Sequence, residues 1–185
     1  DETAKIPKTA QDIINGCTFD NNLPCIAEKE VVVVDTVADE LIYHMEQNGC
    51  YHASPEEVQK LVDTVLDDKN GKKVISRKCV GRSAKVLLGK IGVTVGDEVR
   101  CIIFEGEKTH PLIWTELMMP ILGIVRVKNV DEGIAVAVEL EHGNRHSAHM
   151  HSTNINNLTR FGKAIDTAIF VKNAPSYAAL GFGGE

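Results

Sequence analysis

The chain has 185 residues, of which 43% are hydrophobic and 25% are charged, and its formal net charge is −6. This composition is typical of a globular domain that buries roughly 70% of the surface its unfolded chain would expose. No wholly apolar run exceeds five residues, whereas roughly 20 are needed to cross a bilayer. The acidic balance comes without a basic block that could bind a row of phosphates. The sequence therefore predicts no membrane span and no nucleic-acid partner.

The cysteines are odd in number and widely spaced, without a CxxC pair, at Cys17, Cys25, Cys50, Cys79 and Cys101. This spacing predicts neither a disulfide framework nor a thiolate zinc site, and it favours a reducing, cytoplasmic setting. The chain begins at Asp1 rather than at a methionine, shows no signal-peptide pattern and ends in a glycine-rich stretch. We expect it to be a piece of a longer protein.

In the first half of the chain, apolar periodicity predicts helices and strands in turn. They are a helix over 6–15 ending near Gly16, a buried strand over 30–35, a helix with its apolar stripe over 37–45, and a helix beginning at Ser54. The run Ser54-Pro-Glu-Glu57 has the pattern of a capping box. A polar turn over 67–73, a short helix capped by Ser83 and ending at 91, and a strand over 98–105 follow.

The second half alternates more regularly. It predicts a strand over 121–127, a helix over 131–140, a strand over 147–151, a helix over 154–167 and a strand over 168–172. Alternating strands and helices call for parallel pairing with right-handed crossovers. The predicted fold is a layered α/β domain with a parallel sheet and flanking helices. In such sheets the ligand commonly lies at the carboxyl ends of the strands, and we expect the same here.

Cys25 is the first candidate for chemistry, because it lies in a turn-rich loop with Asn21 and Asn22 before it and Lys29 after it. A nucleophilic thiolate requires such an accessible setting. A free cysteine is also commonly a small buried hydrophobe, and spacing does not separate Cys25 from Cys17. We expect burial of Cys17 in a helix and Cys101 in a strand. Cys50 and Cys79 fall in less regular segments, where they would compete with Cys25 for a thiol reagent.

The histidine-rich stretch 141–151 is the second candidate. His142 and His146 are four residues apart, and His149 and His151 are two apart, as zinc ligands can be. Gly143, Asn144 and Arg145 interrupt the set, which favours a turn over a metal site. The third candidate, Glu116, stands before a predicted strand; taken alone, it is as consistent with a surface charge as with a site residue.

The chain resembles the CoA-acylating aldehyde dehydrogenases, most closely the propionaldehyde and acetaldehyde dehydrogenases of propanediol and ethanolamine utilisation. The resemblance is carried first by the cysteine loop Phe19-Asp-Asn-Asn-Leu-Pro-Cys-Ile-Ala-Glu-Lys-Glu-Val31. Three further segments agree in the family's order, at 110–120, from Leu140-Glu-His-Gly through His151, Ser152 and Asn154, and at 169–181. They span essentially the whole chain.

The resemblance implies that 1–185 form the catalytic, cysteine-nucleophile domain, with the dinucleotide-binding domain and the C-terminal oligomerisation segment largely absent. Cys25 would attack a short-chain aldehyde, hydride would pass to NAD, and CoA would take up the resulting thioester. Glu116 corresponds to the glutamate of the Glu-Ile-Phe-Gly-Pro motif that holds the nicotinamide ribose, although Leu-Met-Met-Pro follows it here. Ser176 and Tyr177 correspond to residues of the aldehyde tunnel.

The same resemblance implies a homo-oligomeric enzyme in the cytoplasm, within a bacterial microcompartment. Other classes remain open, the first within the family that the chain resembles and the others from the residues alone. One is a non-acylating, hydrolytic aldehyde dehydrogenase domain, because the glutamate base of hydrolytic members lies outside this segment. The others are a histidine-ligated metal-binding α/β domain and a non-enzymatic interaction domain. Stoichiometric zinc would favour the metal-binding domain, and a Cys25 no more reactive than the other thiols would favour the interaction domain.

Overall fold

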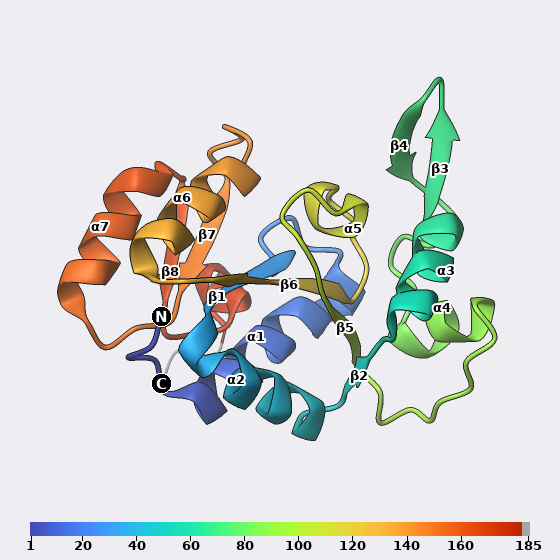
Figure 1. The fold of residues 1–185 in the computed structure, drawn as a ribbon, viewed down its shortest axis with the longest axis horizontal. Helices are drawn as coiled ribbons and strands as arrows, with labels where there is room; N and C mark the ends of the chain where they lie inside the picture. Colours follow the sequence, from blue (N-terminus) through green and yellow to red (C-terminus); the bar gives the residue numbers. More distant parts are fainter. Residues whose placement is uncertain (183–185) are drawn as a thin grey trace.

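The structure is a computed structural model that describes residues 1–182. Its main sheet has four parallel strands in the order β1-β6-β5-β2 (Figure 1). These strands are β1 (Glu30–Val34), β6 (Ile121–Val127), β5 (Cys101–Glu105) and β2 (Cys50–His52). Most of their residues are β-branched or aromatic, which suits strands covered on both faces by helices.

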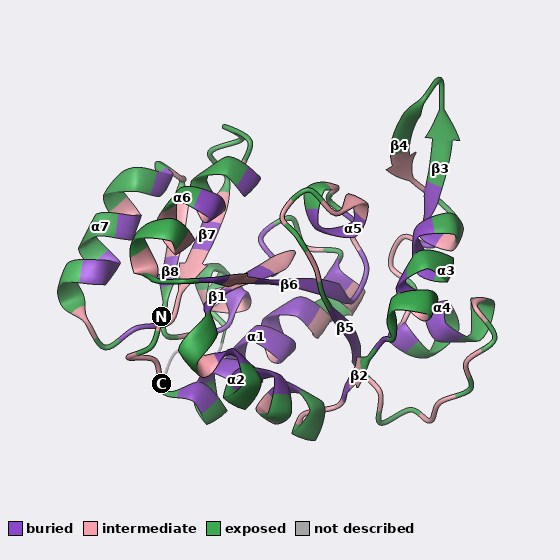
Figure 2. Ribbon diagram, in the orientation of Figure 1, coloured by how far each residue is buried: buried purple, intermediate pink, exposed green. Residues whose placement is uncertain are grey.

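Two helices, α1 (Ile6–Thr18) and α2 (Asp35–Gln47), cover one face of the main sheet. They pack on Ile103, Leu122 and Ile124, which point to this face because successive strand residues alternate between faces. Figure 2 shows the buried residues gathered along the sheet and the helix faces that meet it.

The opposite face is covered by α3 (Pro55–Val65), α4 (Ala84–Lys90) and α6 (Val130–Leu140). These helices pack with Phe104 and Ile121 in the largest of the three core clusters. Helices on both faces of a parallel sheet confirm the predicted fold class. No helix among residues 1–182 is both long and apolar enough to span a bilayer.

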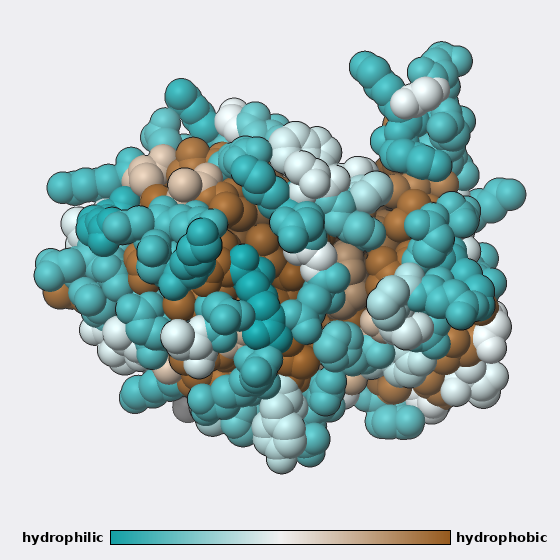
Figure 3. Space-filling view, in the orientation of Figure 1, coloured by the Kyte–Doolittle hydropathy of each residue, from teal (hydrophilic) through white to brown (hydrophobic). Residues whose placement is uncertain are grey.

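A second, smaller unit is built from two parallel strands, β7 (Ser147–Met150) and β8 (Ile169–Lys172), with α7 (Ile155–Ile165) between them in the chain. It has a small core of its own around Ala148 and Phe161, and α6 packs against α7. Figure 1 shows this unit on the left, beside β1. On the face drawn in Figure 3, apolar side chains reach the surface near α6 and β1.

The predicted polar turn over 67–73 is wrong in part. The segment is an antiparallel hairpin of β3 (Leu66–Lys69) and β4 (Lys72–Ile75), which projects from the body of the protein (Figure 1). Its turn is Asn70-Gly71, and both residues have positive φ, 56° and 77°. Asn-Gly is the favoured pair for a two-residue hairpin turn. The polar strands of the hairpin carried no alternating apolar pattern, so the sequence did not reveal them.

Several element boundaries differ from the sequence prediction. Helix α1 continues through Gly16 to Thr18, because helical backbone bonds persist there. Strand β5 begins at Cys101 rather than at residue 98. The capping box at Ser54 is confirmed, with Glu57 N–H donating to the Ser54 hydroxyl and the Glu57 carboxylate accepting from the Ser54 N–H. The remaining short elements are η1 (Phe19–Asn22), α5 (Pro111–Trp114) and η2 (Ser176–Leu180).

Candidate active site

Cys25 lies in the segment that joins α1 to β1 and includes η1, which we call the cysteine loop (residues 19–29). Near its start the loop contains Asp20, Asn21 and Asn22, whose φ angles of 48°, 50° and 66° lie in the left-handed region. Aspartate and asparagine tolerate this region better than other non-glycine residues, which explains the Asp-Asn-Asn run. The resulting sharp turn leaves the Cys25 side chain exposed.

The other four cysteines are buried. Burial of Cys17 and Cys101 confirms the prediction; their sulfur atoms lie 3.8 Å apart behind the cysteine loop. The expectation for Cys50 and Cys79 is wrong. Cys50 lies in β2, which the sequence did not predict, and the thiol of Cys79 donates to the Thr64 carbonyl. Tertiary packing therefore leaves Cys25 as the one exposed thiol of the five.

Asn22 anchors the cysteine loop from within. Its buried side-chain amide donates to the carbonyl of Cys17 at 3.0 Å and to the carbonyl of Glu28 at 2.8 Å. Its Oδ1 accepts a hydrogen bond from Lys29 Nζ at 2.8 Å. One side chain thus joins the end of α1 to the residues that follow Cys25. This network fixes the loop on both sides of the thiol before any substrate binds.

Lys29 also reaches Glu116, with 3.6 Å between Nζ and Oε1. Burial lowers the pKa of Lys29, and the Glu116 carboxylate opposes that shift. The two residues meet because Lys29 directly precedes β1, Glu116 lies before β6, and β1 and β6 are parallel neighbours. These candidate residues therefore lie at the amino ends of the strands. The expectation of a site at the carboxyl ends does not hold for them, because both segments enter the sheet here.

Ser176 and Tyr177 belong to η2, which follows β8 and lies against the cysteine loop. The Tyr177 ring packs on Phe19 with 5.3 Å between ring centroids, and Phe182 lies 6.3 Å from Phe19. Ser176 is only 1% exposed, and its N–H donates to Glu28 Oε1 at 2.9 Å. The structure thus brings Ser176 and Tyr177 to the cysteine loop, but it buries Ser176 beneath the surface.

Sequence reasoning missed Glu28. It is 6% exposed, and burial raises its pKa to about 7 against the hydrogen bonds from Ser176. Its Oε2 finds no hydrogen-bond partner among the described residues. The run Glu28-Lys29-Glu30 resembles a solvated charged segment, so only the loop motif itself could have drawn attention to it. Burial also raises the pKa of Glu30 to about 7.

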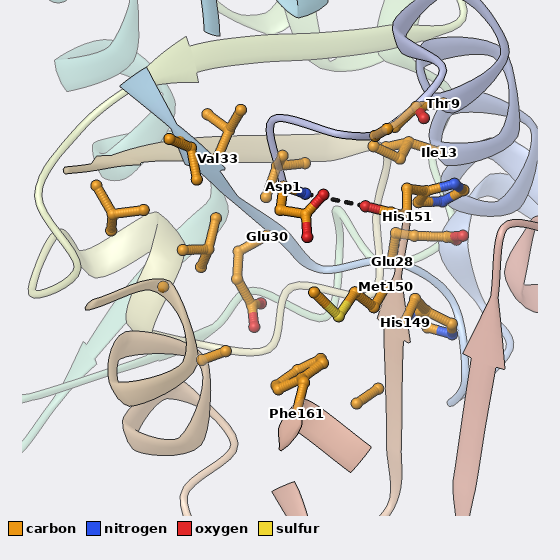
Figure 4. Close-up of a pocket in the computed structure, with 18 of the residues that line it drawn as sticks. Asp1, Thr9, Ile13, Glu28, Glu30, Val33, His149, Met150, His151 and Phe161 are labelled. Carbon is orange, nitrogen blue, oxygen red and sulfur yellow. Dashed lines mark hydrogen bonds between the residues drawn. The ribbon is translucent and has the colours of Figure 1, made fainter. Parts of the chain in front are cut away.

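Behind the cysteine loop lies a cavity of about 220 Å³ between α1, β1, α6 and β7. Figure 4 shows Glu28, Glu30, His149 and His151 among the side chains that line it. Most of the remaining wall is apolar and includes the valines of β1. Cys25 is not part of this wall, although Ala27, Glu28 and Lys29 of the cysteine loop are. The exposed thiol therefore does not line this cavity.

The histidine-rich stretch is divided by the fold. The His142 ring packs on Trp114 with 4.3 Å between centroids, and His146 is exposed in the turn before β7. His149 and His151 face the cavity, where burial lowers the pKa of each to about 4. For His151, the positive charges of Lys8 and of the N-terminus lower the pKa further. Within residues 1–182, no three potential ligands gather to hold a metal ion.

The parallel α/β fold with an exposed cysteine on a loop before β1 agrees with the family that the comparison identifies. The aldehyde dehydrogenase family model matches residues 1–185, and the chain belongs to that family.

Particular relatives are acylating members of the family. The chain is 47% identical to acetaldehyde dehydrogenase (acetylating) EutE of Salmonella typhimurium, over 100% of this chain and 40% of that protein. It is 62% identical, with a TM-score of 0.95, to a propionaldehyde dehydrogenase from the fucose utilisation microcompartment of Clostridium phytofermentans. That match covers 100% of this chain and 42% of the other.

A propionaldehyde dehydrogenase of Rhodopseudomonas palustris, solved with bound CoA and an acylated cysteine, is 51% identical with a TM-score of 0.95. The match again covers 100% of this chain and 42% of the other. These similarities confirm the resemblance to acylating aldehyde dehydrogenases. The chain spans about two fifths of the length of these relatives.

Proposed function

We propose that residues 1–185 are the catalytic domain of a CoA-acylating aldehyde dehydrogenase that converts a short-chain aldehyde to acyl-CoA with NAD. The observation that carries this proposal is Cys25, the one exposed thiol of five, on a loop held in place from both sides. The acylated cysteine and bound CoA in the Rhodopseudomonas palustris relative support the same chemistry. The dinucleotide-binding domain and an oligomerisation segment would belong to the rest of a longer polypeptide.

Cys25 would act as the nucleophile. Its thiolate forms a C–S bond with the aldehyde carbon, and the carbonyl electron pair moves to oxygen to give a thiohemiacetal oxyanion. The backbone N–H of Cys25 would hold this oxyanion together with a donor outside the chain. Loss of hydride from the carbon then leaves a thioester on Cys25. Attack by the CoA thiolate breaks the C–S bond, releases acyl-CoA and restores the Cys25 thiolate.

Glu116 would hold the cofactor. Its side chain is 58% exposed beside the cysteine loop, and Lys29 orients one carboxylate oxygen. An exposed, oriented carboxylate is a suitable acceptor for the vicinal hydroxyls of a ribose. When bound there, the nicotinamide would supply the hydride acceptor. Lys29 thereby couples the cofactor-binding carboxylate to the loop that carries Cys25.

Tyr177 would line the approach of the aldehyde, because it packs on Phe19 at the entry to the cysteine loop. Ser176 would contribute to this wall through its backbone, because its side chain is buried. A short-chain aldehyde suits a path bounded by these rings. The microcompartment source of one relative supports a similar location for this protein. A cytoplasmic homo-oligomer is part of the same proposal and rests on the family resemblance alone.

The decisive experiment uses the full-length polypeptide with propionaldehyde and NAD. With CoA withheld, peptide mass mapping should find the propionyl group on Cys25 and on no other cysteine, and added CoA should release it as propionyl-CoA. A Cys25→Ser variant should form no acyl adduct, whereas Cys17→Ala should still form it. Rapid release of propionate without CoA would instead favour a hydrolytic enzyme. Acylation of a different cysteine would overturn the assignment.

A further inference from the structure

Glu28 occupies an unusual position for a carboxylate. It lies three residues after Cys25 and two before β1, and its side chain is 6% exposed. Burying a carboxyl group costs free energy unless hydrogen bonds replace those lost to water. A carboxyl group in such a place is expected to make contacts that an apolar side chain could not.

The contacts of Glu28 join three segments of the chain. Its Oε1 accepts the N–H of Ser176 at 2.9 Å, a bond between residues 148 apart in sequence. Its backbone carbonyl accepts the amide of Asn22 at 2.8 Å, and the same amide donates to the Cys17 carbonyl. Glu28 therefore fixes the cysteine loop on one side and the start of η2 on the other.

The packing around the carboxyl group is tight. A β-carbon built on Gly16 of α1 would overlap the Glu28 carboxylate, so any larger residue at this position would require that carboxylate to move. Glycine inside a helix costs roughly 1 kcal/mol relative to alanine. Helix α1 thus carries a destabilising residue at the one point where the Glu28 side chain crosses it.

A second contact, at the protein surface, also holds η2 against the cysteine loop. Tyr177, next to Ser176, packs on Phe19 of the cysteine loop. The hydrogen bond from Ser176 to Glu28 holds the start of η2 from below, while the aromatic pair holds it at the surface. Without the carboxylate, the Ser176 N–H would lose its acceptor, and η2 would be held to the cysteine loop through the Phe19–Tyr177 contact and to α1 and β8 by packing.

We propose that Glu28 is a positioning residue that holds the Ser176–Tyr177 segment against the cysteine loop and so sets the aldehyde-side wall beside Cys25. It acts through the Ser176 N–H and does not touch the reacting atoms. This inference rests on the proposed function, since it assigns the wall of that site. Loss of the bond should affect aldehyde binding before it affects turnover at saturating aldehyde.

The test uses the full-length polypeptide and four variants. Glu28→Ala removes the acceptor, Glu28→Gln keeps an oxygen acceptor of the same shape, and Ser176→Pro removes the N–H donor. The matched control is Glu107→Ala, which replaces an exposed glutamate beyond the carboxyl end of β5, whereas the cysteine loop lies at the amino end of β1. Glu28→Ala should raise the KM for propionaldehyde about tenfold, with kcat changed less, because small misplacements of a binding wall weaken positioning. Glu28→Gln and Glu107→Ala should stay within about twofold of the parent.

A double-mutant cycle separates positioning from general stabilisation. If Glu28 acts through the Ser176 N–H, then Glu28→Ala and Ser176→Pro should have similar effects, and the double variant should be no worse than either. Additive effects on KM, or a folded Glu28→Ala protein with an unchanged KM for propionaldehyde, would overturn the inference. Should Glu28→Ala fail to fold, Ser176→Pro carries the same test through its own KM.

Hydrogen exchange gives a readout independent of activity. The Ser176 amide should exchange slowly in the parent protein and in Glu28→Gln, and faster in Glu28→Ala. If the Ser176 amide were equally protected in a folded Glu28→Ala protein, the positioning role of Glu28 would be refuted. If the parent protein formed no acyl-CoA but showed the expected exchange pattern, the proposed function would be refuted and the contact between Glu28 and Ser176 would stand. The two failures are therefore distinguishable.

Discussion

Lys29 and Glu116, distant in the chain, form an ion pair of 3.6 Å at the amino ends of two adjacent strands. Lys29 also donates to Asn22, so a single ammonium group links the anchor of the cysteine loop to the carboxylate proposed to bind the cofactor. Glu116 is largely exposed, whereas Lys29 is mostly covered. Replacing Lys29 should therefore change the free energy of unfolding much more than replacing Glu116.

We predict that Lys29→Met lowers the free energy of unfolding by about 1–3 kcal/mol, because it leaves the buried Asn22 Oδ1 without its donor. Glu116→Gln should change it by less than about 0.5 kcal/mol, since exposed ion pairs contribute little. Urea denaturation of the chain, followed by the fluorescence of Trp114, measures both. Equal losses for the two variants would contradict the assignment of Asn22 as the more important partner.

Cys25 should react first with a thiol reagent. Substoichiometric iodoacetamide near neutral pH should alkylate Cys25 ahead of the four buried cysteines, because only Cys25 is exposed. Peptide mapping with time identifies the site. Cys25→Ala should abolish the fast phase and Cys17→Ala should preserve it. Earlier alkylation of Cys50 or Cys79 would show that their burial is not maintained in solution.

Glu28 should make stability depend on pH. Its pKa rises from 4.5 to about 7 on folding, so the folded state holds the proton more tightly. The resulting stabilisation is full below pH 4.5 and is lost as the pH rises through about 7; at about 1.36 kcal/mol per pKa unit it amounts to about 3 kcal/mol. Glu28→Gln cannot ionise. Relative to the parent, it should gain up to about 3 kcal/mol between acid pH and about pH 8 in urea denaturation.

The matched control for that measurement is Glu107→Gln, which changes an exposed carboxyl group and should track the parent at every pH. Glu30, whose pKa is also raised to about 7, contributes the same trend to the parent and to Glu28→Gln, so it cancels in the comparison. A difference between Glu28→Gln and the parent that does not grow with pH would mean that folding does not raise the pKa of Glu28.

Asn22 should be the most costly residue of the cysteine loop to replace. Asn22→Ala removes two buried hydrogen bonds to carbonyl groups and puts alanine, which tolerates left-handed backbone less well than asparagine, at φ 66°. We expect a loss of about 2–4 kcal/mol in the free energy of unfolding. Asn22→Gly relieves the backbone strain but not the lost bonds, so it should lose less. If alanine and glycine are equally costly, the left-handed backbone contributes nothing measurable.

The 185-residue chain alone should not oxidise propionaldehyde with NAD and CoA. The proposed cofactor contacts within it come from Glu116, and positioning of the reactants supplies several kcal/mol of barrier lowering that one carboxylate cannot replace. An NADH absorbance assay on the chain, with the full-length polypeptide as the positive control, measures this. Robust NADH formation by the chain would show that the cofactor site is complete within residues 1–185.

The sequence by itself determined most of the local structure and placed Cys25 in an accessible loop. The valine run of β1, the capping box of α3 and the apolar stripes of α2 and α7 are short-range patterns, and each formed the predicted element. The cysteine loop was also readable locally, because turn residues surround Cys25 within one short segment. Polar strands such as β3 and β4 carry no such pattern, and the sequence did not reveal them.

Only the tertiary structure decided which charged and thiol groups are buried. Glu28, Lys29 and Glu30 are consecutive charged residues, yet Glu28 lies under α1 and η2 while Lys29 reaches Glu116. Cys50 became inaccessible because β2 pairs with β5, and Ser176 because η2 docks on the cysteine loop. These outcomes depend on contacts between residues far apart in the chain. Local composition does not specify such contacts, because they form only when the whole sheet and its helices are assembled.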